Sequence, residues 1–303
     1  MANKLLRVAL VGTGRWGSII AKTLGTLPEC RLAYQATREW RSLLEKTDID
    51  GIIIATPPST HTEIALAFIE HGIPVYIEKP LAVSAVDAQK ILDAAQASGA
   101  PVFVGHIHLY NPAYQETKKL SNTIGALKVL VGEGANMGPY REDYSAMWDY
   151  GSHDIYMMLD LVGEMPESVQ AWGTAVLRPG TALWDIAQIK LNFKNAAVGY
   201  ILSSSVMPQK RRHLTVVGET GSIVFDDTLL EKKVMLRADN GDISHPAYEP
   251  GMPLTLELQA FLNTIKTGAK PNATAAEGLA VVRVLETAEK SIAASGIATK
   301  ITT

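Results

Sequence analysis

Three polar side chains have types and spacings suited to moving protons. Lys79 comes two positions after the apolar run 75–77. Asp149 and His153 are four residues apart, so on a helix they would lie on one face and meet. An aspartate one turn before a histidine can orient the ring and raise its basicity. The alternative is an aspartate that favours the helix dipole, beside an unrelated histidine.

A predicted β-α-β unit positions Lys79. Ile52–Ile54 are β-branched residues with no polar partner, which is typical of a strand buried on both faces of a parallel sheet. A helix should follow, with Ser59 or Thr60 as its cap, and the run 75–77 is the next strand. Open parallel sheets bind ligands at the carboxyl ends of their strands. The sequence therefore predicts Lys79 at a ligand-binding edge.

A glycine-rich turn follows the first apolar run, 6–11, and opens a helix. Strand, glycine turn and helix form the context that the dinucleotide fingerprint requires. Gly12 permits the tight turn, Gly14 lets the backbone approach a pyrophosphate, and Gly17 lets helix and strand pack closely. The helix N-terminus offers N–H groups to the phosphates. A tight turn without a ligand is the alternative, but the context favours a dinucleotide.

The segment expected to bind the adenine ribose departs from this plan. The second strand, 31–36, ends at Thr37 and Arg38, where a Rossmann unit usually has an acidic residue. Only a short helix separates it from the next strand, so we expect this half of the cofactor site to be abbreviated. Thr37 and Arg38 could receive a 2′-phosphate, or they could form an ordinary solvated turn. We predict that NADP(H) is at least tolerated.

Two histidines follow another buried strand, 101–104, at the same sheet edge. His106 and His108 would share a face if the segment is extended. They could bind a metal, but no cysteine or carboxylate completes a ligand set nearby. We therefore expect them to line a pocket and expect no metal site.

The second half of the chain has a different pattern. Alternation of apolar and polar residues at 188–193 and 198–202 is typical of a sheet with one wet face. The stretches 213–217 and 222–225 flank a hairpin-like turn, and two helices are expected at 150–161 and 274–294. The predicted fold is α/β: a Rossmann domain with a parallel sheet over residues 1–119, then an α+β domain with an open, mostly antiparallel sheet over 120–303.

Composition excludes several classes of partner. The chain has 303 residues and a formal charge of −3, and its longest basic run is Lys210-Arg211-Arg212, so no nucleic-acid partner is expected. The single cysteine, Cys30, precludes an internal disulfide and fits a reducing compartment; it is best explained as a small buried hydrophobe. We expect a soluble, cytoplasmic protein with no membrane partner, because neither a signal segment nor a spanning apolar stretch is evident.

The chain resembles the Gfo/Idh/MocA family, the NAD(P)-dependent oxidoreductases related to glucose–fructose oxidoreductase and inositol dehydrogenases. The resemblance covers essentially the whole chain. It rests on Gly12-Thr13-Gly14-Arg15-Trp16-Gly17, Ala55-Thr56-Pro57 with His61, Glu78-Lys79-Pro80, and Asp149-Tyr150-Gly151-Ser152-His153. It implies that Lys79 touches nicotinamide and a substrate hydroxyl, that Asp149 and His153 complete the catalytic site, and that the cofactor is NAD or NADP. The expected cofactor-binding residues are Gly12, Thr13, Gly14, Arg15, Trp16, Thr37, Arg38, Thr56, Pro57, Pro58, His61, Glu78 and Lys79.

The substrate side is less sharply predicted. Asn111, Tyr140 and Arg141 are expected to line the pocket together with His108, and Arg141 could grip a carboxylate or phosphate through two parallel hydrogen bonds. Surface or packing roles are the alternative for the first three. Relatives often have an arginine where this chain has His108, so the substrate is left open.

The predicted function is hydride transfer between a nicotinamide cofactor and the CH–OH or carbonyl carbon of a sugar, sugar acid, cyclitol or related polyol. His153 would take the hydroxyl proton while Lys79 stabilises the developing alkoxide. One alternative is a cofactor-binding sensor without turnover; another is reduction of a non-sugar carbonyl or an unsaturated ring.

The family resemblance also implies self-assembly. The second domain of the family often forms dimers or tetramers through the bare face of its sheet, so a homodimer or homotetramer is expected. The predicted interface is one apolar face that carries Val198, Tyr200 and Leu202 beside Ile189, Leu191 and Phe193.

Overall fold

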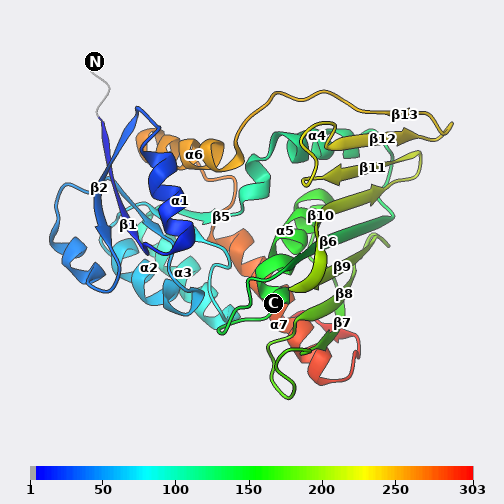
Figure 1. Ribbon diagram of the computed structural model, residues 1–303. Coiled ribbons are helices and arrows are strands. Elements are labelled where there is room, and N and C mark those ends of the chain that lie inside the picture. The colour runs from blue at the N-terminus through cyan, green and yellow to red at the C-terminus, as the bar shows by residue number, and fades with distance from the viewer. Residues whose placement is uncertain (1–4, 303) are drawn as a thin grey trace. The chain divides into compact units, whose positions relative to one another are not determined.

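The structure is a computed structural model that describes residues 5–302 (Figure 1). The chain divides into two compact units. The first contains the described residues up to Tyr110 and the later segment Gly251–Val282, and the second contains Asn111–Pro250 and the described residues from Arg283 onward. Each unit is therefore built from two stretches of sequence, whereas the predicted domains, 1–119 and 120–303, are continuous.

A parallel five-stranded sheet with the order β2-β1-β3-β4-β5 forms the centre of the first unit. Its strands are β1 (Leu6–Val11), β2 (Cys30–Ala36), β3 (Gly51–Ile54), β4 (Val75–Glu78) and β5 (Val102–Gly105). Its helices are α1 (Arg15–Leu24), α2 (His61–Ile69), α3 (Ala85–Ser98), α6 (Pro253–Thr267) and the start of α7 (Ala275–Ala293), with short 3₁₀ turns η1 (Trp40–Glu45), η2 (Pro58–Thr60) and η3 (Ile107–Tyr110). Every residue of β3, β4 and β5 is buried, as their apolar sequences predict.

Local signals explain most helix boundaries in this unit, with one exception. The Ser84 hydroxyl accepts from the Asp87 N–H at 3.0 Å and begins α3, which ends at Gly99 in the left-handed conformation. Thr60 precedes α2, but its hydroxyl donates backward to Thr56 Oγ1 and to the Pro57 carbonyl, both at 2.8 Å. The predicted Ser or Thr side-chain cap of α2 is therefore wrong, because a 3₁₀ turn precedes the helix.

Helix α6 completes the core of the first unit although it comes late in the chain. Its Phe261 ring meets the Tyr76 ring edge-on, with centroids 5.7 Å apart, and Tyr76 stacks on Phe103 at 5.2 Å. Gly51 packs against Phe261 and Ile265, and a Cβ there would come within 2.5 Å of Ile265 Cδ1 and 3.2 Å of Phe261 Cζ. The sequence analysis missed α6, although Pro253 at its first position and Gly268 beyond its end are typical helix boundaries.

The second unit is built on a nine-stranded sheet with the order β13-β12-β11-β10-β6-β9-β8-β7-β14. Its strands are β6 (Val129–Met137), β7 (Ser168–Thr174), β8 (Ile186–Asn192), β9 (Val198–Ser204), β10 (Val206–Val217), β11 (Gly221–Asp226), β12 (Val234–Ala238), β13 (Ile243–Ser244) and β14 (Thr299–Lys300). Its helices are α4 (Pro112–Ser121), which the sequence analysis missed, α5 (Ser152–Val162) and the end of α7, with a π-helical turn, η4 (Met147–Gly151), before α5. Only β6 and β9 pair in parallel, so the predicted mostly antiparallel sheet is confirmed.

The register between β8 and β9 corrects the predicted apolar face. Ile189 pairs with Ile201, and Lys190 pairs with Tyr200. Residues 189, 191 and 193 are therefore buried on one side, whereas 198, 200 and 202 lie on the other. Because side chains alternate across a strand, the length of the connecting turn decides which residues share a face. The prediction that both sets share one apolar face is therefore wrong.

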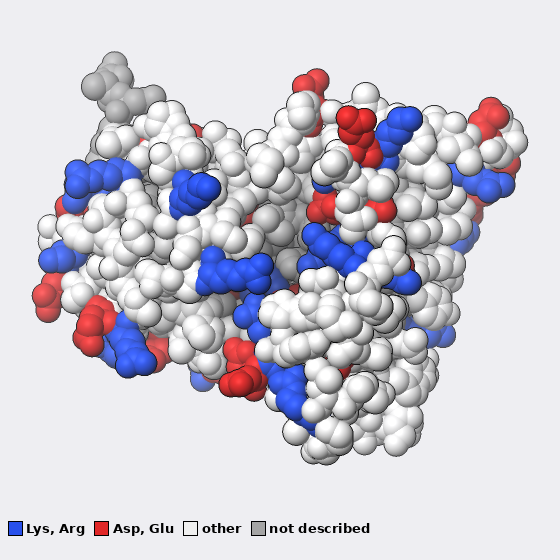
Figure 2. All heavy atoms as spheres, in the orientation of Figure 1, with Lys and Arg blue, Asp and Glu red and all other residues white. Residues whose placement is uncertain are grey.

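The described surface has a mixed charge. On the face in Figure 2, Lys and Arg side chains lie among Asp and Glu side chains and most of the surface carries neither. Among residues 5–302, no helix combines the length and the apolar character needed to cross a membrane.

Candidate active site

The glycine turn between β1 and α1 is shaped to receive a phosphate group. Gly12 has a φ of 100°, and a Cβ there would collide with the backbone of Ala55 and Thr56. A Cβ on Gly17 would collide with the Gly12 carbonyl. A Cβ on Gly14, in contrast, would meet nothing within 4 Å, and no side chain caps α1 there. This open approach and the uncapped N–H groups fit a dinucleotide pyrophosphate.

The end of β2 lies next to this turn. The hydroxyls of Thr13 and Thr37 are 3.0 Å apart, and Arg38 is exposed beside Thr37. The single 3₁₀ turn η1 stands where a full crossover helix is usual, which confirms the expected abbreviation. The residues predicted to recognise the adenine ribose are thus close to the phosphate cradle.

His61 is a structural link in the first unit. Its side chain is completely buried, with Nδ1 3.0 Å from the Pro80 carbonyl oxygen and Nε2 3.0 Å from that of Thr56. Burial lowers the pKa of the imidazole, opposed by the hydrogen bonds to these carbonyls. Both ring nitrogens face the main chain, so this geometry does not support the predicted contact with the cofactor. The ring instead ties the turn after β3 to the turn after β4.

The Glu78-Lys79-Pro80 segment lies at the carboxyl end of β4, as predicted. Lys79 is half-buried, and its peptide bond to Pro80 is cis. Glu78 is buried and accepts from Trp16 Nε1 at 2.6 Å and from the Tyr76 hydroxyl at 3.0 Å. Trp16 and Glu78, both expected to bind the cofactor, are therefore hydrogen-bonded to each other.

The two histidines after β5 are not on an extended segment. Residues Ile107–Tyr110 form the 3₁₀ turn η3, so the prediction that His106 and His108 share the face of a strand is wrong. Both are buried. Burial, then the neighbouring Lys79 and His108, lower the pKa of His106 to about 3. Within residues 5–302 no group of three or more His, Cys, Asp or Glu side chains is arranged to hold a metal ion.

In the second unit, Asp149 and His153 lie on consecutive helical segments. Asp149 is buried in the π-helical turn η4 and His153 is half-buried in the first turn of α5. Arg141 Nε lies 3.5 Å from Asp149 Oδ2, and its guanidinium lies 5.4 Å from the centre of the Tyr144 ring. Arg141, predicted to grip the substrate, is thus an ion-pair partner of the predicted catalytic aspartate.

Asn111 and Tyr140 have local roles in the second unit. Asn111 caps α4: its Oδ1 accepts from the Ala113 N–H at 3.0 Å and its Nδ2 donates to Asp227 at 2.9 Å. The exposed Tyr140 hydroxyl lies 3.1 Å from Met137 Sδ. The hydrogen bonds of Asn111 therefore agree with a packing role, the alternative to lining the substrate pocket.

Sequence reasoning missed the buried acids Asp154, Asp185 and Glu257, of which Asp154 and Glu257 have raised pKa values. Glu257 in α6 is fully buried near Glu78 and Tyr76. Asp154 follows His153, and burial raises the pKa of Asp154 to about 8. The Arg212 charge opposes this rise, and the Glu133 charge adds to it. The only available signal for Asp154 was its place next to His153; Glu257 offered none, because glutamate is rarely buried.

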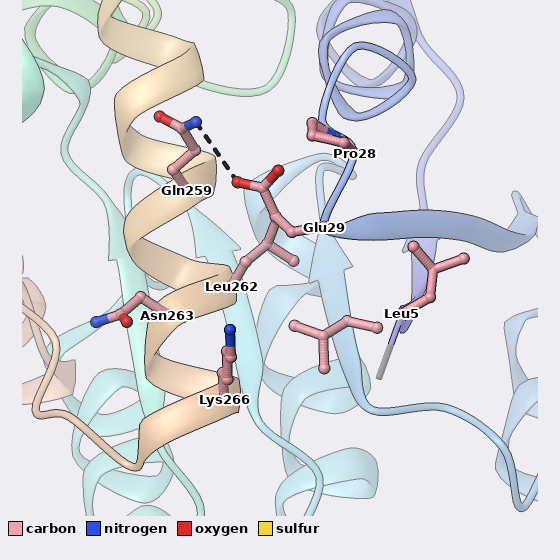
Figure 3. A pocket seen from close by; sticks show the side chains of 8 residues that line it. Leu5, Pro28, Glu29, Gln259, Leu262, Asn263 and Lys266 are labelled. Carbon is pink, nitrogen blue, oxygen red and sulfur yellow. Dashed lines mark hydrogen bonds between the residues drawn. The ribbon is translucent and has the colours of Figure 1, made fainter. Parts of the chain in front are cut away.

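A hollow of about 430 Å³ lies elsewhere in the first unit (Figure 3). Helix α6 contributes Gln259, Asn263 and Lys266 to it, opposite Leu5, Pro28 and Glu29. None of the predicted site residues lines this hollow.

Comparison with known proteins agrees with these features. Residues 29–106 match the model described as oxidoreductase family, NAD-binding Rossmann fold, of Gfo/Idh/MocA, and residues 122–224 match the C-terminal domain model of the same group. A solved structure of a protein from Magnetospirillum magnetotacticum MS-1 is 32% identical, with a TM-score of 0.83, and the match covers 94% of this chain and 99% of that one. The chain belongs to the Gfo/Idh/MocA family. The predicted family, fold class and nicotinamide-dependent oxidoreductase activity are confirmed.

Two curated relatives are named for reactions on inositols. The myo-inositol 2-dehydrogenase of Thermotoga maritima is 26% identical, with 95% of this chain and 96% of the relative covered. The scyllo-inositol 2-dehydrogenase (NAD(+)) of Bacillus subtilis 168 is 28% identical, with 88% of each covered. Both relatives are named for the oxidation of a cyclitol.

Proposed function

We propose that this enzyme interconverts a secondary alcohol and a carbonyl on a cyclitol, sugar, sugar acid or related polyol. The observation that carries the proposal is the first unit itself, where an open glycine cradle and Lys79 follow strands of one parallel sheet. The curated inositol dehydrogenases support the substrate class. A cytoplasmic location stays a prediction.

The cofactor would be held by the glycine turn and by residues near the end of β2. Gly14 leaves space for the pyrophosphate, the N–H groups at the start of α1 would bind it, and Thr37 and Arg38 would receive the adenine ribose. When bound, the nicotinamide supplies the hydride acceptor or donor. NAD and NADP are both consistent with this residue set.

Three side chains would act on the substrate. The Lys79 ammonium would donate a hydrogen bond to the reacting oxygen and stabilise its developing negative charge. The half-buried His153 would take the hydroxyl proton. Asp149 would hold a neighbouring substrate hydroxyl or orient the His153 ring. Because Arg141 already pairs with Asp149, an anionic substrate group would have to share that guanidinium.

Purified enzyme with NAD⁺ or NADP⁺ and a panel of cyclitols, aldoses and sugar acids tests the proposal. We expect reduced-cofactor absorbance with at least one polyol.

His153→Asn should lower turnover by ~10²–10⁴-fold with nearly unchanged cofactor affinity, and Lys79→Met should lower turnover by at least as much. Asp149→Asn should slow turnover or weaken substrate binding in a folded protein. Full activity of His153→Asn on the true substrate would remove that residue from the mechanism, and turnover of non-polyol carbonyls alone would overturn the substrate class.

A further inference from the structure

Two carboxyl groups are buried together beside the glycine turn of the first unit. Glu78 ends β4 and is 8% exposed, whereas Glu257 on α6 is 0% exposed. Tyr76 lies near both of them. Strand β5 makes room for this cluster, since a Cβ on Gly105 would come within 2.6 Å of the Tyr76 hydroxyl and 3.2 Å of Glu78 Cδ.

The hydrogen bonds of regular geometry around the pair go to Glu78, and the Tyr76 hydroxyl also lies close enough to Glu257 to lower the pKa of that acid. Trp16 Nε1 donates to Glu78 Oε1 at 2.6 Å, and the Tyr76 hydroxyl donates to the same oxygen at 3.0 Å. The next residue is Lys79, whose charge favours an ionised Glu78. Glu257 has no such set: within the described residues both of its oxygens lack a hydrogen bond of regular geometry, and Tyr76 is the polar group beside it.

This asymmetry assigns one negative charge and one proton. Two neighbouring carboxylates in a dry interior cannot both ionise at ordinary cost. Burial raises the pKa of both acids. At Glu78 the Trp16 and Tyr76 donors and the Lys79 charge oppose the rise. At Glu257 the nearby Glu78 adds to the rise, and only Tyr76 opposes it. The charge therefore belongs on Glu78 and the proton on Glu257.

We propose that the Glu78 carboxylate is a positioning residue that joins the phosphate-binding turn to Lys79, and that Glu257 supports it as a neutral acid. Trp16 lies in the first turn of α1, directly after the glycine turn, and Glu78 immediately precedes Lys79, so one carboxylate oxygen fixes both parts of the site. A displacement of ~1 Å at a reacting group can cost ~10²-fold in rate. This inference rests on the role proposed for Lys79, and it replaces direct cofactor binding as the role of Glu78.

The groups that face this pair are few. Trp16 comes from α1 and Tyr76 from β4, Lys79 directly follows β4, and Gly105 of β5 lies against Tyr76 and Glu78. Tyr110 of η3 lies close enough to Glu257 for that acid to help raise its pKa, after burial as the main cause. Among these neighbours, Lys79 carries the positive charge that favours the Glu78 carboxylate.

Two isosteric variants with opposite expected results test the assignment. Glu257→Gln replaces a neutral acid by a neutral amide, so turnover and the cofactor dissociation constant should stay within about twofold of wild type. Glu78→Gln replaces the anion and brings an amide N–H toward two donors, so turnover should fall by ~10–100-fold. Circular dichroism checks that both variants are folded. Equal losses in the two variants, or full activity of Glu78→Gln, would overturn the proposal.

A measurement of stability against pH needs no substrate. In the folded protein the Glu257 pKa is raised well above 4.5, the ordinary value that applies in the unfolded chain. Above pH 4.5 the unfolded chain therefore binds fewer protons at this position than the folded chain, and wild-type stability falls as pH rises. Glu257→Gln removes this loss, so its melting temperature relative to wild type should increase from pH 5 to pH 8. A constant difference, or a variant unfolded at both pH values, would contradict a neutral Glu257.

Trp16→Phe is the second route if Glu78→Gln does not fold. This variant keeps an aromatic ring but removes the N–H that Glu78 accepts, and we expect weaker cofactor binding and lower turnover; wild-type values for both would overturn the link. If no polyol is a substrate while cofactor binding and the pH dependence follow expectation, the proposed substrate class fails and the assignment of Glu78 and Glu257 stands.

Discussion

His106 shows how a single buried side chain sets the response of this enzyme to acid. Its folded-state pKa is lowered to about 3, first by burial and then by Lys79 and His108, from an ordinary value of 6.5. Between these values the unfolded chain binds a proton that the folded chain does not, so stability is present above pH 6.5 and is lost as pH falls. His61 contributes in the same direction, because burial lowers its pKa too.

We therefore predict that His106→Gln flattens the acid side of the stability curve. Wild-type unfolding free energy should decrease from pH 7 to pH 4 by at most about 1.4 kcal/mol per pH unit for this one group, and the variant should lack that part. Denaturant titrations at several pH values measure it, with His71→Gln at an exposed position as control. Parallel curves for wild type and His106→Gln would show that the ring titrates normally.

Arg38 is the residue on which cofactor preference is predicted to depend. It is exposed beside Thr37, whose hydroxyl lies 3.0 Å from that of Thr13 in the glycine turn, and no acid ends β2 to repel a 2′-phosphate. Arg38→Ala should weaken NADP⁺ binding by about tenfold or more, the loss of one charged hydrogen bond, and leave NAD⁺ binding nearly unchanged. Arg31→Ala, exposed near the start of the same strand, is the control. Wild-type binding of NAD⁺ about a hundredfold tighter than NADP⁺ would overturn the prediction of tolerance.

At the scale of elements, the first unit was predictable because each signal is local. Short apolar runs bounded by glycine or proline predicted β1, β3, β4 and β5. Because the end of a strand fixes where the next residues lie, these strands placed Lys79 and the glycine turn at the carboxyl edge of the sheet. Relations across the chain were not predictable. The position of Glu257 depends on α6 returning to the first unit, and the faces of β8 and β9 depend on one residue of turn length.

The packing of α5 on β6 gives a prediction for an element pair. Asp154 of α5 is buried against two glycines of β6; a Cβ on Gly132 would come within 2.9 Å of Asp154 Oδ1 and 3.0 Å of its Cβ. We predict that Gly132→Ala lowers the free energy of unfolding by ~1–3 kcal/mol through overpacking, measured by urea titration. Gly25→Ala is a matched control, since its Cβ would meet atoms no closer than 3.4 Å. Equal stabilities of the two variants would mean that α5 can shift away from the sheet.

At the scale of the whole molecule, the open face of the second unit's sheet is the predicted site of self-assembly. Helices α4 and α5 pack on one face (Figure 1). The opposite face carries Trp172, Tyr200 and Val131, which are 49%, 44% and 37% exposed, and Val131 pairs with Tyr200 across β6 and β9. Apolar residues gathered on one sheet face are typical of a symmetric interface. We propose a homodimer or homotetramer built on this face. Ile189, Leu191 and Phe193, which the sequence analysis included in the interface, are excluded because they are buried on the other face.

Charge placed at the centre of this face should separate the subunits. Tyr200→Glu would bury an unpaired carboxylate in the interface, so light scattering should give a monomer mass for the variant and a multiple of it for wild type. Leu230→Glu is the control, because Leu230 is 96% exposed outside the sheet strands and its change should leave the mass unaltered. A wild-type monomer at micromolar concentration would refute assembly itself. An oligomeric Tyr200→Glu protein would instead move the interface to another surface, since a buried charge at the contact could not be accommodated without loss of affinity.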